Sequence, residues 1–316
     1  MKERMQSHSA RPGLTTTGED FEMTASGFSR IGSYEVERML SCHGQGIVFL
    51  ARDPLMKRKV ILKVYRCNGT VRTNRRLVNE ARALTRLGGR GSPLGFAVER
   101  FGNSEFLVME YLEGRTLREL LGSSVAPVRI AMQVLLQTAQ ALRFVHQAEL
   151  VHLDIKPSNI IVTHNGVVKI IDFGLVQAIG KVQTAFSGTP AYMAPERLVV
   201  GSGPVDQRAD IFSLGAVLYE MLTGKAPFST VSNRRSRELG WDSINVAPND
   251  IEKLGSYCSE ICSRCLSKDL NRRYPSTAEL QTALQRMIAK YDADHRRKSM
   301  IAPSRSIADM LLSALT

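Results

Sequence analysis

Three side chains that carry acid or amide groups lie in one short stretch of the sequence, VHLDIKPSNIIVTHNGVVKIIDFG, which runs from Val151 to Gly174. The groups belong to Asp154, Asn159 and Asp172. An amide oxygen and a carboxylate held close together suit a hard divalent cation such as Mg²⁺, which binds few protein ligands and keeps phosphate oxygens or water. If Asn159 and Asp172 provide those ligands, the Asp154 carboxylate is free to meet a nucleophile.

A β-hairpin is expected to position these groups. Two β-branched runs, residues 160–163 and 167–171, flank Asn165-Gly166, the dipeptide that best supports a two-residue type I′ turn. In the register of such a turn, Asn159 lies directly opposite Asp172, with the Cβ atoms roughly 5 Å apart. The alternative is a surface hairpin whose ends are merely polar.

The complete string resembles the Hanks-type protein kinases. HLDIKPSN is similar to their catalytic loop, DFG at residues 172–174 to their metal-binding motif, and APE at residues 194–196 to the end of their activation segment. The resemblance covers about residues 31–290. It implies that Asp154 is the base or orienter of the substrate hydroxyl, that Lys156 lies near the γ-phosphate, and that Asn159 and Asp172 hold Mg²⁺, with Mn²⁺ as an alternative metal.

Two upstream residues complete the catalytic set that the resemblance implies. Lys63, in the alternating strand KVILKVY, is similar to the lysine that holds the α- and β-phosphates of ATP. Glu80 lies in RRLVNEARALTRL, whose apolar residues recur at helical spacing, and is expected to pair with Lys63. Taken alone, either residue is more often an ordinary surface charge.

A strongly apolar segment further downstream, DIFSLGAVLYEMLTG, predicts a helix that is buried all round and ends at Gly224. By the family resemblance, Asp210 at the start of this helix braces the backbone of the catalytic loop. Arg273 is expected to pair with Glu196. Both of these roles are structural.

The resemblance also implies a set of nucleotide-binding positions, with Met109 as the gatekeeper behind the adenine pocket: Gly44, Gly46, Val48, Ile61, Lys63, Met109, Glu110, Leu112, Asn159, Ile161 and Asp172. Two departures from the family pattern fall here. Ser41 and His43 occupy the first two glycine positions of the usual glycine-rich loop, and Ile61 replaces the alanine that lies against adenine. Both changes bring nucleotide affinity into question. The alternative to an active enzyme is therefore a pseudokinase-like scaffold or a nucleotide-binding interaction module with little catalytic activity.

Leu153 stands where most family members carry an arginine that grips a phosphate on the activation loop. We therefore expect a non-RD kinase, which is active without phosphorylation of that loop or is switched by something else. Lys156 and the GTPAY string around Thr189 resemble the serine/threonine branch, and the short activation segment resembles the bacterial eukaryotic-like kinases. The implied activity is transfer of the ATP γ-phosphate to Ser or Thr hydroxyls of proteins, including autophosphorylation.

The implied fold is α+β and two-lobed. A β-rich N-lobe with one helix, residues 31–112, joins a mainly helical C-lobe, residues 113–290, through a hinge at Glu110 to Leu112, with ATP between the lobes. Residues 1–30 lack periodicity, which predicts a disordered tail. For residues 291–316 we expect a basic linker followed by an amphipathic helix, whose apolar face comprises Ile307, Met310, Leu311 and Ala314. This helix is expected to dock on the kinase body or on a partner; the alternative is a frayed tail without a function.

Composition bounds the remaining possibilities. The 316 residues are 43% hydrophobic, which is ample for such a core, but no apolar run approaches the roughly 18 residues of a membrane span, so we expect a cytoplasmic protein without a transmembrane segment. The net charge of +12 comes from scattered basic residues and favours acidic substrates or partners over specific nucleic-acid binding. Cys258, Cys262 and Cys265 share one helix face, which predicts core packing rather than a zinc site.

Overall fold

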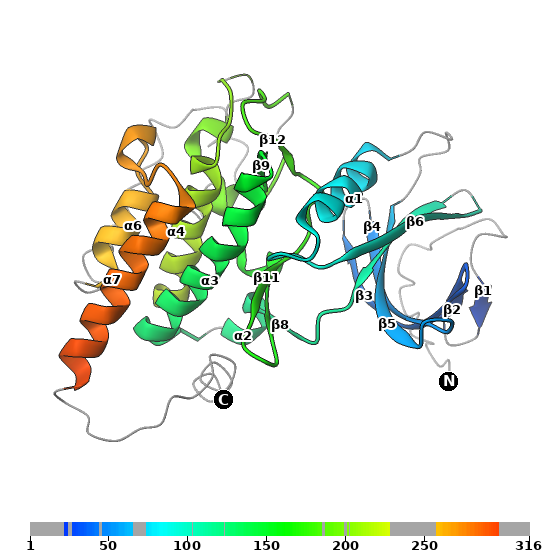
Figure 1. Cartoon of the computed structure of the whole chain (residues 1–316). Helices are drawn as coiled ribbons and strands as arrows, with labels where there is room; N and C mark the ends of the chain where they lie inside the picture. Colours follow the sequence, from blue (N-terminus) through cyan, green and yellow to red (C-terminus); the bar gives the residue numbers. More distant parts are fainter. Residues whose placement is uncertain are drawn as a thin grey trace, which may run out of the picture.

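Strands and helices separate along the chain into a β-rich N-terminal part and a mainly helical C-terminal part. The computed structural model describes residues 22–24, 27–43, 46–65, 74–102, 104–122, 124–184, 187–198, 201, 203–227 and 257–296. In Figure 1 the blue-to-cyan sheet lies on one side and the green-to-orange helices lie on the other. This arrangement confirms the expected α+β, two-lobed architecture.

The N-lobe is built on one antiparallel sheet in the order β1-β2-β3-β4-β5-β7-β6. Its strands are β1 (Glu22–Thr24), β2 (Gly27–Ile31), β3 (Tyr34–His43), β4 (Gly46–Asp53), β5 (Arg58–Tyr65), β6 (Gly95–Phe101) and β7 (Ser104–Glu110). One face carries an apolar cluster that includes Phe49, Leu62 and Phe106, each at most 1% exposed. Because successive side chains of a strand point to opposite faces, Ile61 and Lys63 of β5 lie on the other face.

The first two strands correct the expectation of a disordered tail. β1 and β2 fall within residues 1–30, apart from Ile31, and β2 pairs with β3 through Arg30↔Glu35 and Ile31↔Tyr34. Ile31 is completely buried in the apolar cluster of the sheet. Pairing along a strand satisfies the backbone polar groups of such a segment without an amphipathic pattern in the segment itself. The rest of the expected tail lies outside the described residues.

The helix of the N-lobe, α1 (Arg75–Leu87), begins and ends at recognisable caps. The Asn74 side chain accepts a hydrogen bond from the Arg76 amide, and Gly88 ends the helix with a left-handed φ of 56°. Its apolar side chains Leu77 and Leu84 are buried, and Glu80 is buried on the same side. The helix predicted around Glu80 is therefore confirmed.

The C-lobe is organised around a helix that is buried on all sides, α4 (Arg208–Thr223). Every residue from Ala209 to Met221 is buried, and Gly224 caps the helix with a φ of 74°, as the sequence predicts. The other elements are the helices α2 (Leu117–Leu121), α3 (Val128–Gln147), α6 (Ser259–Cys265) and α7 (Thr277–Arg296), and the short strands β8 (Gly114–Thr116), β9 (Leu150–Val151), β10 (Ile160–Thr163), β11 (Val168–Ile170) and β12 (Gln177–Ala178).

The three cysteines pack between α4 and α6. All three are completely buried, which confirms the expected core packing. A Cβ atom added to Gly215 of α4 would come within 2.5 Å of the Cys265 Cβ, so glycine is needed for the two helices to approach this closely. Burial raises the pKa of the Cys258 thiol to about 11, which keeps it neutral. Among the described residues, no group of three His, Cys, Asp or Glu side chains is arranged to hold a metal ion.

The hairpin of β10 and β11 differs by one residue from the predicted register. The pairs are Ile160↔Ile170 and Val162↔Val168, and the loop comprises the three residues from His164 to Gly166. Gly166 has a φ of 78° and donates its amide to the Thr163 carbonyl at 2.8 Å. A glycine in this conformation after a tight turn is characteristic of three-residue hairpin loops.

The predicted two-residue turn is therefore wrong, and so is the direct opposition of Asn159 and Asp172. The Ile171 amide donates to the Asn159 carbonyl at 2.9 Å, which makes Ile171 the partner of Asn159. Asp172 follows one residue later and has a positive φ of 65°. Both side chains still lie at the same end of the hairpin, because the register is shifted by only one residue.

The end of the C-lobe also differs from the prediction, because α7 continues to Arg296 and so passes the expected boundary at residue 290. Asp292 forms an ion pair with Arg129 of α3 at 2.6 Å, and the Tyr291 ring packs against Tyr257 with 5.1 Å between centroids. These tertiary contacts hold residues that look like linker in the sequence. The predicted amphipathic helix within residues 301–316 lies outside the described residues. None of the described helices has both the length and the apolar composition to cross a membrane.

Candidate active site

Lys63 is the central cation of the site. Its Nζ lies 2.8 Å from Oε2 and 3.0 Å from Oε1 of Glu80, and 2.7 Å from Oδ1 of Asp172. It therefore links β5, α1 and the segment that follows β11. Burial disfavours its charge, but the carboxylates of Glu80 and Asp172 outweigh burial and raise the pKa of Lys63. The expected pairing of Lys63 with Glu80 is present.

Glu80 is only 1% exposed, and three donors satisfy its carboxylate. Besides Lys63, the Phe173 amide donates to Oε1 at 3.2 Å and the Tyr65 hydroxyl donates to Oε2. Burial, together with the neighbouring Glu80 charge, raises the pKa of Tyr65, so the phenol remains a neutral donor. Sequence reasoning did not identify Tyr65. The available signal was its position two residues after Lys63, which places both side chains on the same face of β5.

Asp172 has a carboxylate that is only partly enclosed by its neighbours. Its side chain is 44% exposed although one oxygen binds Lys63. Burial of part of the group works against ionisation, but the Lys63 cation outweighs it, with smaller contributions from His152 and Lys156, and the pKa of Asp172 lies below its usual range. The adjacent Phe173 is completely buried and packs edge to face on His152, with 4.7 Å between ring centroids.

Asp154 is the second acidic centre, within the catalytic loop, His152 to Asn159. Its Oδ1 accepts a hydrogen bond from the Thr189 hydroxyl at 3.1 Å, and its Oδ2 lies 2.7 Å from Lys156 Nζ. Lys156 also donates to the Thr189 hydroxyl at 2.9 Å. A hydroxyl, an ammonium and a carboxylate are thus all hydrogen-bonded to one another.

The Asn159 side chain has a defined orientation. Its amide nitrogen donates to the Asp154 carbonyl at 2.8 Å and to Oδ2 of the same residue at 3.1 Å. This arrangement turns the amide oxygen away from Asp154. With the open carboxylate of Asp172, it provides the neutral and anionic oxygen donors that Mg²⁺ prefers, so the residues present fit that metal.

Asp210, which is fully buried at the start of α4, holds the backbone of the catalytic loop. Its carboxylate accepts hydrogen bonds from the backbone amides of His152 and Leu153 at 2.9 and 2.8 Å, and it lies 2.9 Å from His146 Nε2. These donors more than offset burial and lower the pKa of Asp210. The bracing contact expected for Asp210 is present.

The expected nucleotide-binding positions on the sheet share one face. Val48 pairs with Lys63, and Ile61 pairs with Met109, so all four side chains point the same way. Val48 and Ile61 are half-buried and Met109 is buried. This face offers an apolar surface that ends at a cation, which suits a base joined to phosphates.

The other expected nucleotide positions surround that face. Gly46 pairs with His43, and a Cβ atom at Gly46 would lie 3.3 Å from the Val64 carbonyl. Leu112 is buried and Ile161 of β10 is half-buried. The Glu110 carboxylate is bound to Lys169 at 2.9 Å and to the Leu94 amide at 3.0 Å, so its side chain is already engaged. Gly44 lies outside the described residues.

The end of the activation segment, Asp172 to Glu196, is anchored on the C-lobe. Glu196 forms two hydrogen bonds of 2.8 Å with Arg273, the contact that the sequence predicts. Arg273 is 1% exposed. Arg118 joins Glu220 to the Tyr192 hydroxyl nearby, each at 2.6 Å. These contacts keep the C-terminal end of the segment attached to the C-lobe.

Comparisons with known proteins identify the family of the chain. Residues 34–285 match the protein kinase domain family. The serine/threonine-protein kinase PknB of Mycobacterium tuberculosis (strain H37Rv) is 34% identical over 274 residues, which are 80% of this chain and 42% of PknB. PknL of the same organism is 38% identical over 203 residues, 62% of this chain and 50% of PknL.

A third relative is the probable serine/threonine-protein kinase CA_C1728 of Clostridium acetobutylicum, which is 30% identical over 269 residues, 83% of this chain and 41% of that protein. The chain thus spans about half or less of the length of these relatives. The family match nevertheless covers Lys63, Glu80, the catalytic loop and the whole activation segment. The chain belongs to the protein kinase domain family, and its relatives are bacterial serine/threonine-protein kinases.

Proposed function

We propose that this chain is a protein kinase that transfers the γ-phosphate of ATP, with Mg²⁺, to Ser or Thr hydroxyls of protein substrates, including its own chain. The observation that carries the proposal is the pair of acidic centres, Asp172 and Asp154, each bound to a lysine. Asp172 is bound to the Lys63–Glu80 pair, while Asp154 is hydrogen-bonded to Lys156 and to a hydroxyl. The names of the bacterial relatives support the same activity.

The chain's own residues divide the work between binding and positioning. Lys63 is held as a cation by Glu80 and Asp172, so it is oriented toward the α- and β-phosphates before ATP arrives. Val48, Ile61, Met109, Leu112 and Ile161 provide the apolar surroundings of the adenine. Since the Glu110 carboxylate is engaged elsewhere, the hinge contributes through its backbone.

Asn159 and Asp172 are the residues that would hold the metal, which neutralises phosphate charge when bound. Asp154 accepts a hydrogen bond from the substrate hydroxyl and orients its oxygen toward the γ-phosphate. The Thr189 hydroxyl already occupies such a donor position at 3.1 Å from Oδ1. Lys156 lies 2.7 Å from the same carboxylate and brings a positive charge to the place where negative charge develops on the transferred group.

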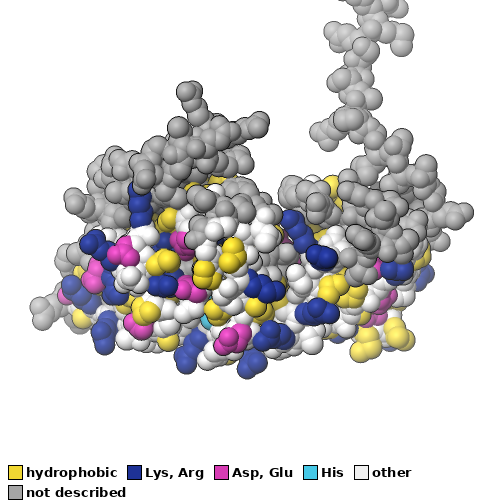
Figure 2. Space-filling model, turned by 90° about the horizontal axis from the view of Figure 1, so that it is seen from above, with side chains coloured by type: hydrophobic (Ala, Val, Ile, Leu, Met, Phe, Trp, Pro, Cys, Tyr) yellow, Lys and Arg dark blue, Asp and Glu magenta, His cyan; other side chains and the backbone are white. Residues whose placement is uncertain are grey.

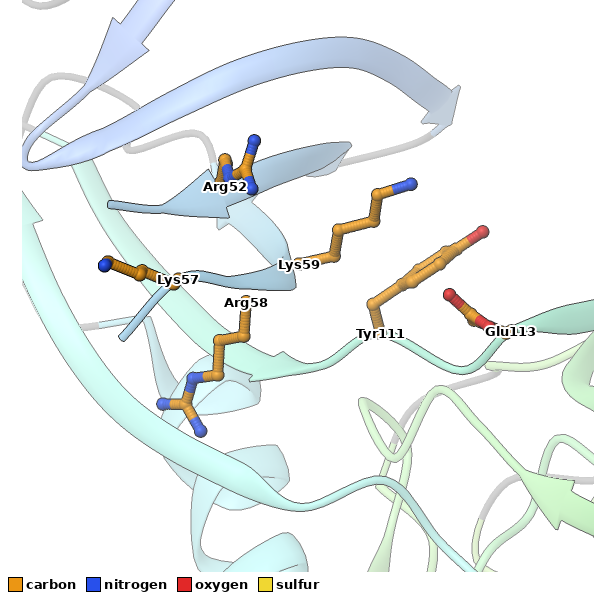
Figure 3. Close-up of a pocket in the computed structure, with 6 residues that line it drawn as sticks. All are labelled: Arg52, Lys57, Arg58, Lys59, Tyr111 and Glu113. Atoms are coloured by element: carbon orange, nitrogen blue, oxygen red, sulfur yellow. The ribbon is translucent and has the colours of Figure 1, made fainter. Parts of the chain in front are cut away.

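The surface charge favours acidic substrates. Figure 2 shows Lys and Arg side chains spread widely over one face of the molecule, with fewer acidic ones among them. A pocket of about 400 Å³ beside the hinge is lined by Arg52, Lys57, Arg58, Lys59, Tyr111 and Glu113 (Figure 3). Four of these six side chains are cationic and one is acidic. With the net charge of +12, this balance attracts acidic protein segments toward the hinge side.

The decisive variant is Asp154→Asn, which keeps the size of the side chain and removes its basicity. Transfer of labelled phosphate to a Ser/Thr peptide should fall by about 100-fold or more, because Asn cannot accept the hydroxyl proton. Affinity for Mg²⁺-ATP should change little, since Asp154 lies on the substrate side. Equal transfer rates for wild type and variant at saturating Mg²⁺-ATP would support the scaffold alternative and refute the enzyme.

A further inference from the structure

Arg197 is a buried cation immediately after the activation segment, and the catalytic set described above does not use it. It is 2% exposed and ends the short helical turn Pro195–Arg197. Its Nη1 donates to the Leu153 carbonyl, its Nη2 to the Ser187 carbonyl at 2.8 Å, and its Nε to Oε1 of Gln183 at 3.1 Å. One guanidinium therefore joins the catalytic loop to two points of the activation segment.

The two backbone contacts flank the reacting groups. Leu153 immediately precedes Asp154, and Ser187 lies two residues before Thr189. The side chains of Asp154 and Thr189 are hydrogen-bonded to each other at 3.1 Å. Two connections therefore join the catalytic loop to the activation segment. One is the hydrogen bond between Asp154 and Thr189, and the other runs through Arg197, which binds the carbonyls of Leu153 and Ser187.

The packing around these two connections leaves little freedom. Gly188 lies between the tied residues with a φ of 113°, and a Cβ atom there would come within 3.3 Å of the Leu153 carbonyl and 3.6 Å of Arg197 Nη1. Leu153 itself is 4% exposed, and its amide donates to Asp210 at 2.8 Å. The backbone of Leu153 is therefore held at its amide by Asp210 of α4 and at its carbonyl by Arg197.

The contacts of Arg197 do not depend on ionisable or modifiable partners. Among the described residues, its hydrogen bonds go to two backbone carbonyls and one amide oxygen, with no carboxylate in the set. A buried guanidinium without a directly bound acid is costly, so these charge-assisted hydrogen bonds must be well formed. Leu153 has no donor for a phosphate, so a phosphorylated loop could not be gripped from that position.

We propose that Arg197 is a positioning residue that holds the activation segment against the catalytic loop and keeps Asp154 aligned with Thr189 without phosphorylation of that segment. The catalytic consequence of this proposal rests on the proposed kinase activity. The clamp itself, meaning the hydrogen bonds of Arg197 with Leu153, Ser187 and Gln183, is a structural property. In kinases that depend on phosphorylation, the phosphorylated activation loop maintains this alignment. Here the alignment is maintained by Arg197, which follows the APE motif.

The test is Arg197→Lys, which keeps the charge but cannot span three acceptors with one ammonium group. Arg129→Lys is the control, because Arg129 pairs with Asp292 between α3 and α7 and, within the described part of the chain, forms no hydrogen bond or ion pair with the catalytic loop or the activation segment. Three experiments are carried out on wild type and both variants. They measure Mg²⁺-ATP affinity, the steady-state kcat and KM for a Ser/Thr peptide, and hydrogen exchange of the backbone amides of residues 187–189 and of α4.

For Arg197→Lys we expect kcat to fall about tenfold or more with Mg²⁺-ATP affinity within about twofold of wild type. Exchange at residues 187–189 should quicken about fivefold or more while α4 stays protected. Arg129→Lys should match wild type in all three measurements. A wild-type kcat in Arg197→Lys, or faster exchange in α4 as well as in residues 187–189, would overturn the proposal, the latter by showing only a loss of global stability.

The exchange measurement distinguishes failure of the Arg197 contacts from failure of the proposed kinase activity. If wild type transfers no more phosphate than Asp154→Asn, the proposed function fails, and the exchange of residues 187–189 in Arg197→Lys still decides whether the clamp exists. Locally faster exchange would then support the clamp, and unchanged exchange would refute it.

Discussion

Replacing Tyr65 with phenylalanine removes one oxygen from the buried surroundings of Glu80. The ring is retained, so its packing in the apolar core should survive, and Tyr65 is only 4% exposed. The lost group is the hydroxyl that donates to Oε2 of Glu80. Glu80 keeps its contacts with Lys63 at 2.8 and 3.0 Å and with the Phe173 amide at 3.2 Å.

The loss of stability in Tyr65→Phe can be estimated from the donors that Glu80 keeps. A hydrogen bond to a charged group contributes about 1.5 to 3 kcal/mol, and loss of a donor from a carboxylate that keeps other donors should fall at the low end. We therefore expect Tyr65→Phe to lower the free energy of unfolding by about 1.5 kcal/mol. In a protein of this size, that corresponds to a fall in Tm of about 3 °C.

Catalysis should be affected much less than stability, because the ion pair of Lys63 with Glu80 is intact. We expect kcat/KM for ATP to stay within about threefold of wild type. Since the pKa of Tyr65 is raised, its hydroxyl donates over the whole working pH range, and the difference in Tm should not vary between about pH 6 and 9.

Thermal unfolding of wild type, Tyr65→Phe and Tyr257→Phe tests this reasoning. Tyr257 also donates its hydroxyl to a carboxylate, Asp294 at 2.8 Å, but that contact is exposed, so Tyr257→Phe should leave Tm unchanged. Equal Tm values for Tyr65→Phe and wild type would show that the buried hydroxyl contributes nothing. A fall in kcat/KM of about 100-fold would show that Glu80 depends on Tyr65 for its position, contrary to the account.

Three further predictions concern the periphery of the site. Glu196→Gln should destabilise the C-lobe by about 3 kcal/mol in denaturant unfolding, because it leaves the buried Arg273 charge uncompensated; an unchanged midpoint would contradict the value assigned to this pair. Restoring glycine at both Ser41 and His43 should lower the KM for ATP severalfold, about 1 kcal/mol of binding, whereas an unchanged or raised KM would mean that the present residues already accommodate phosphate. Alanine at both Thr184 and Ser187 should leave most of kcat intact in steady-state assays, since the clamp uses the Ser187 carbonyl and not its hydroxyl; an inactive double variant would refute phosphorylation-independent alignment.

Much of the site is predictable because its chemistry is local in sequence. Asp154, Lys156 and Asn159 fall within six residues, and their mutual contacts follow from that spacing. The buried helix α4 is equally accessible, because an apolar segment with no polar face must be enclosed wherever it lies. Lys63 and Glu80 are harder, since they are far apart in sequence, and only the motif order relates them to Asp172.

The features that sequence reasoning missed depend on tertiary contacts or on turn chemistry. Tyr65 looks like any aromatic residue in a strand, and its partner Glu80 is on another element. Arg197 has three partners, none closer than ten residues along the chain, so no local pattern marks it. In the hairpin, Asn165-Gly166 predicts a two-residue turn. In the structure, the Thr163 hydroxyl accepts a hydrogen bond from the Val167 amide at 3.0 Å, which supports a loop that is one residue longer.

The central claim is that the two acidic centres transfer phosphate, and the most direct test compares wild type with Asp172→Asn. Labelled ATP, a Ser/Thr peptide and a titration of Mg²⁺ are used, and the labelled residue is identified. We expect Mg²⁺-dependent labelling of Ser or Thr by wild type, and a loss of about 100-fold or more in Asp172→Asn, which removes the anionic metal ligand while keeping its shape. Equal labelling by the two proteins, or wild-type labelling that does not respond to Mg²⁺, would contradict the claim.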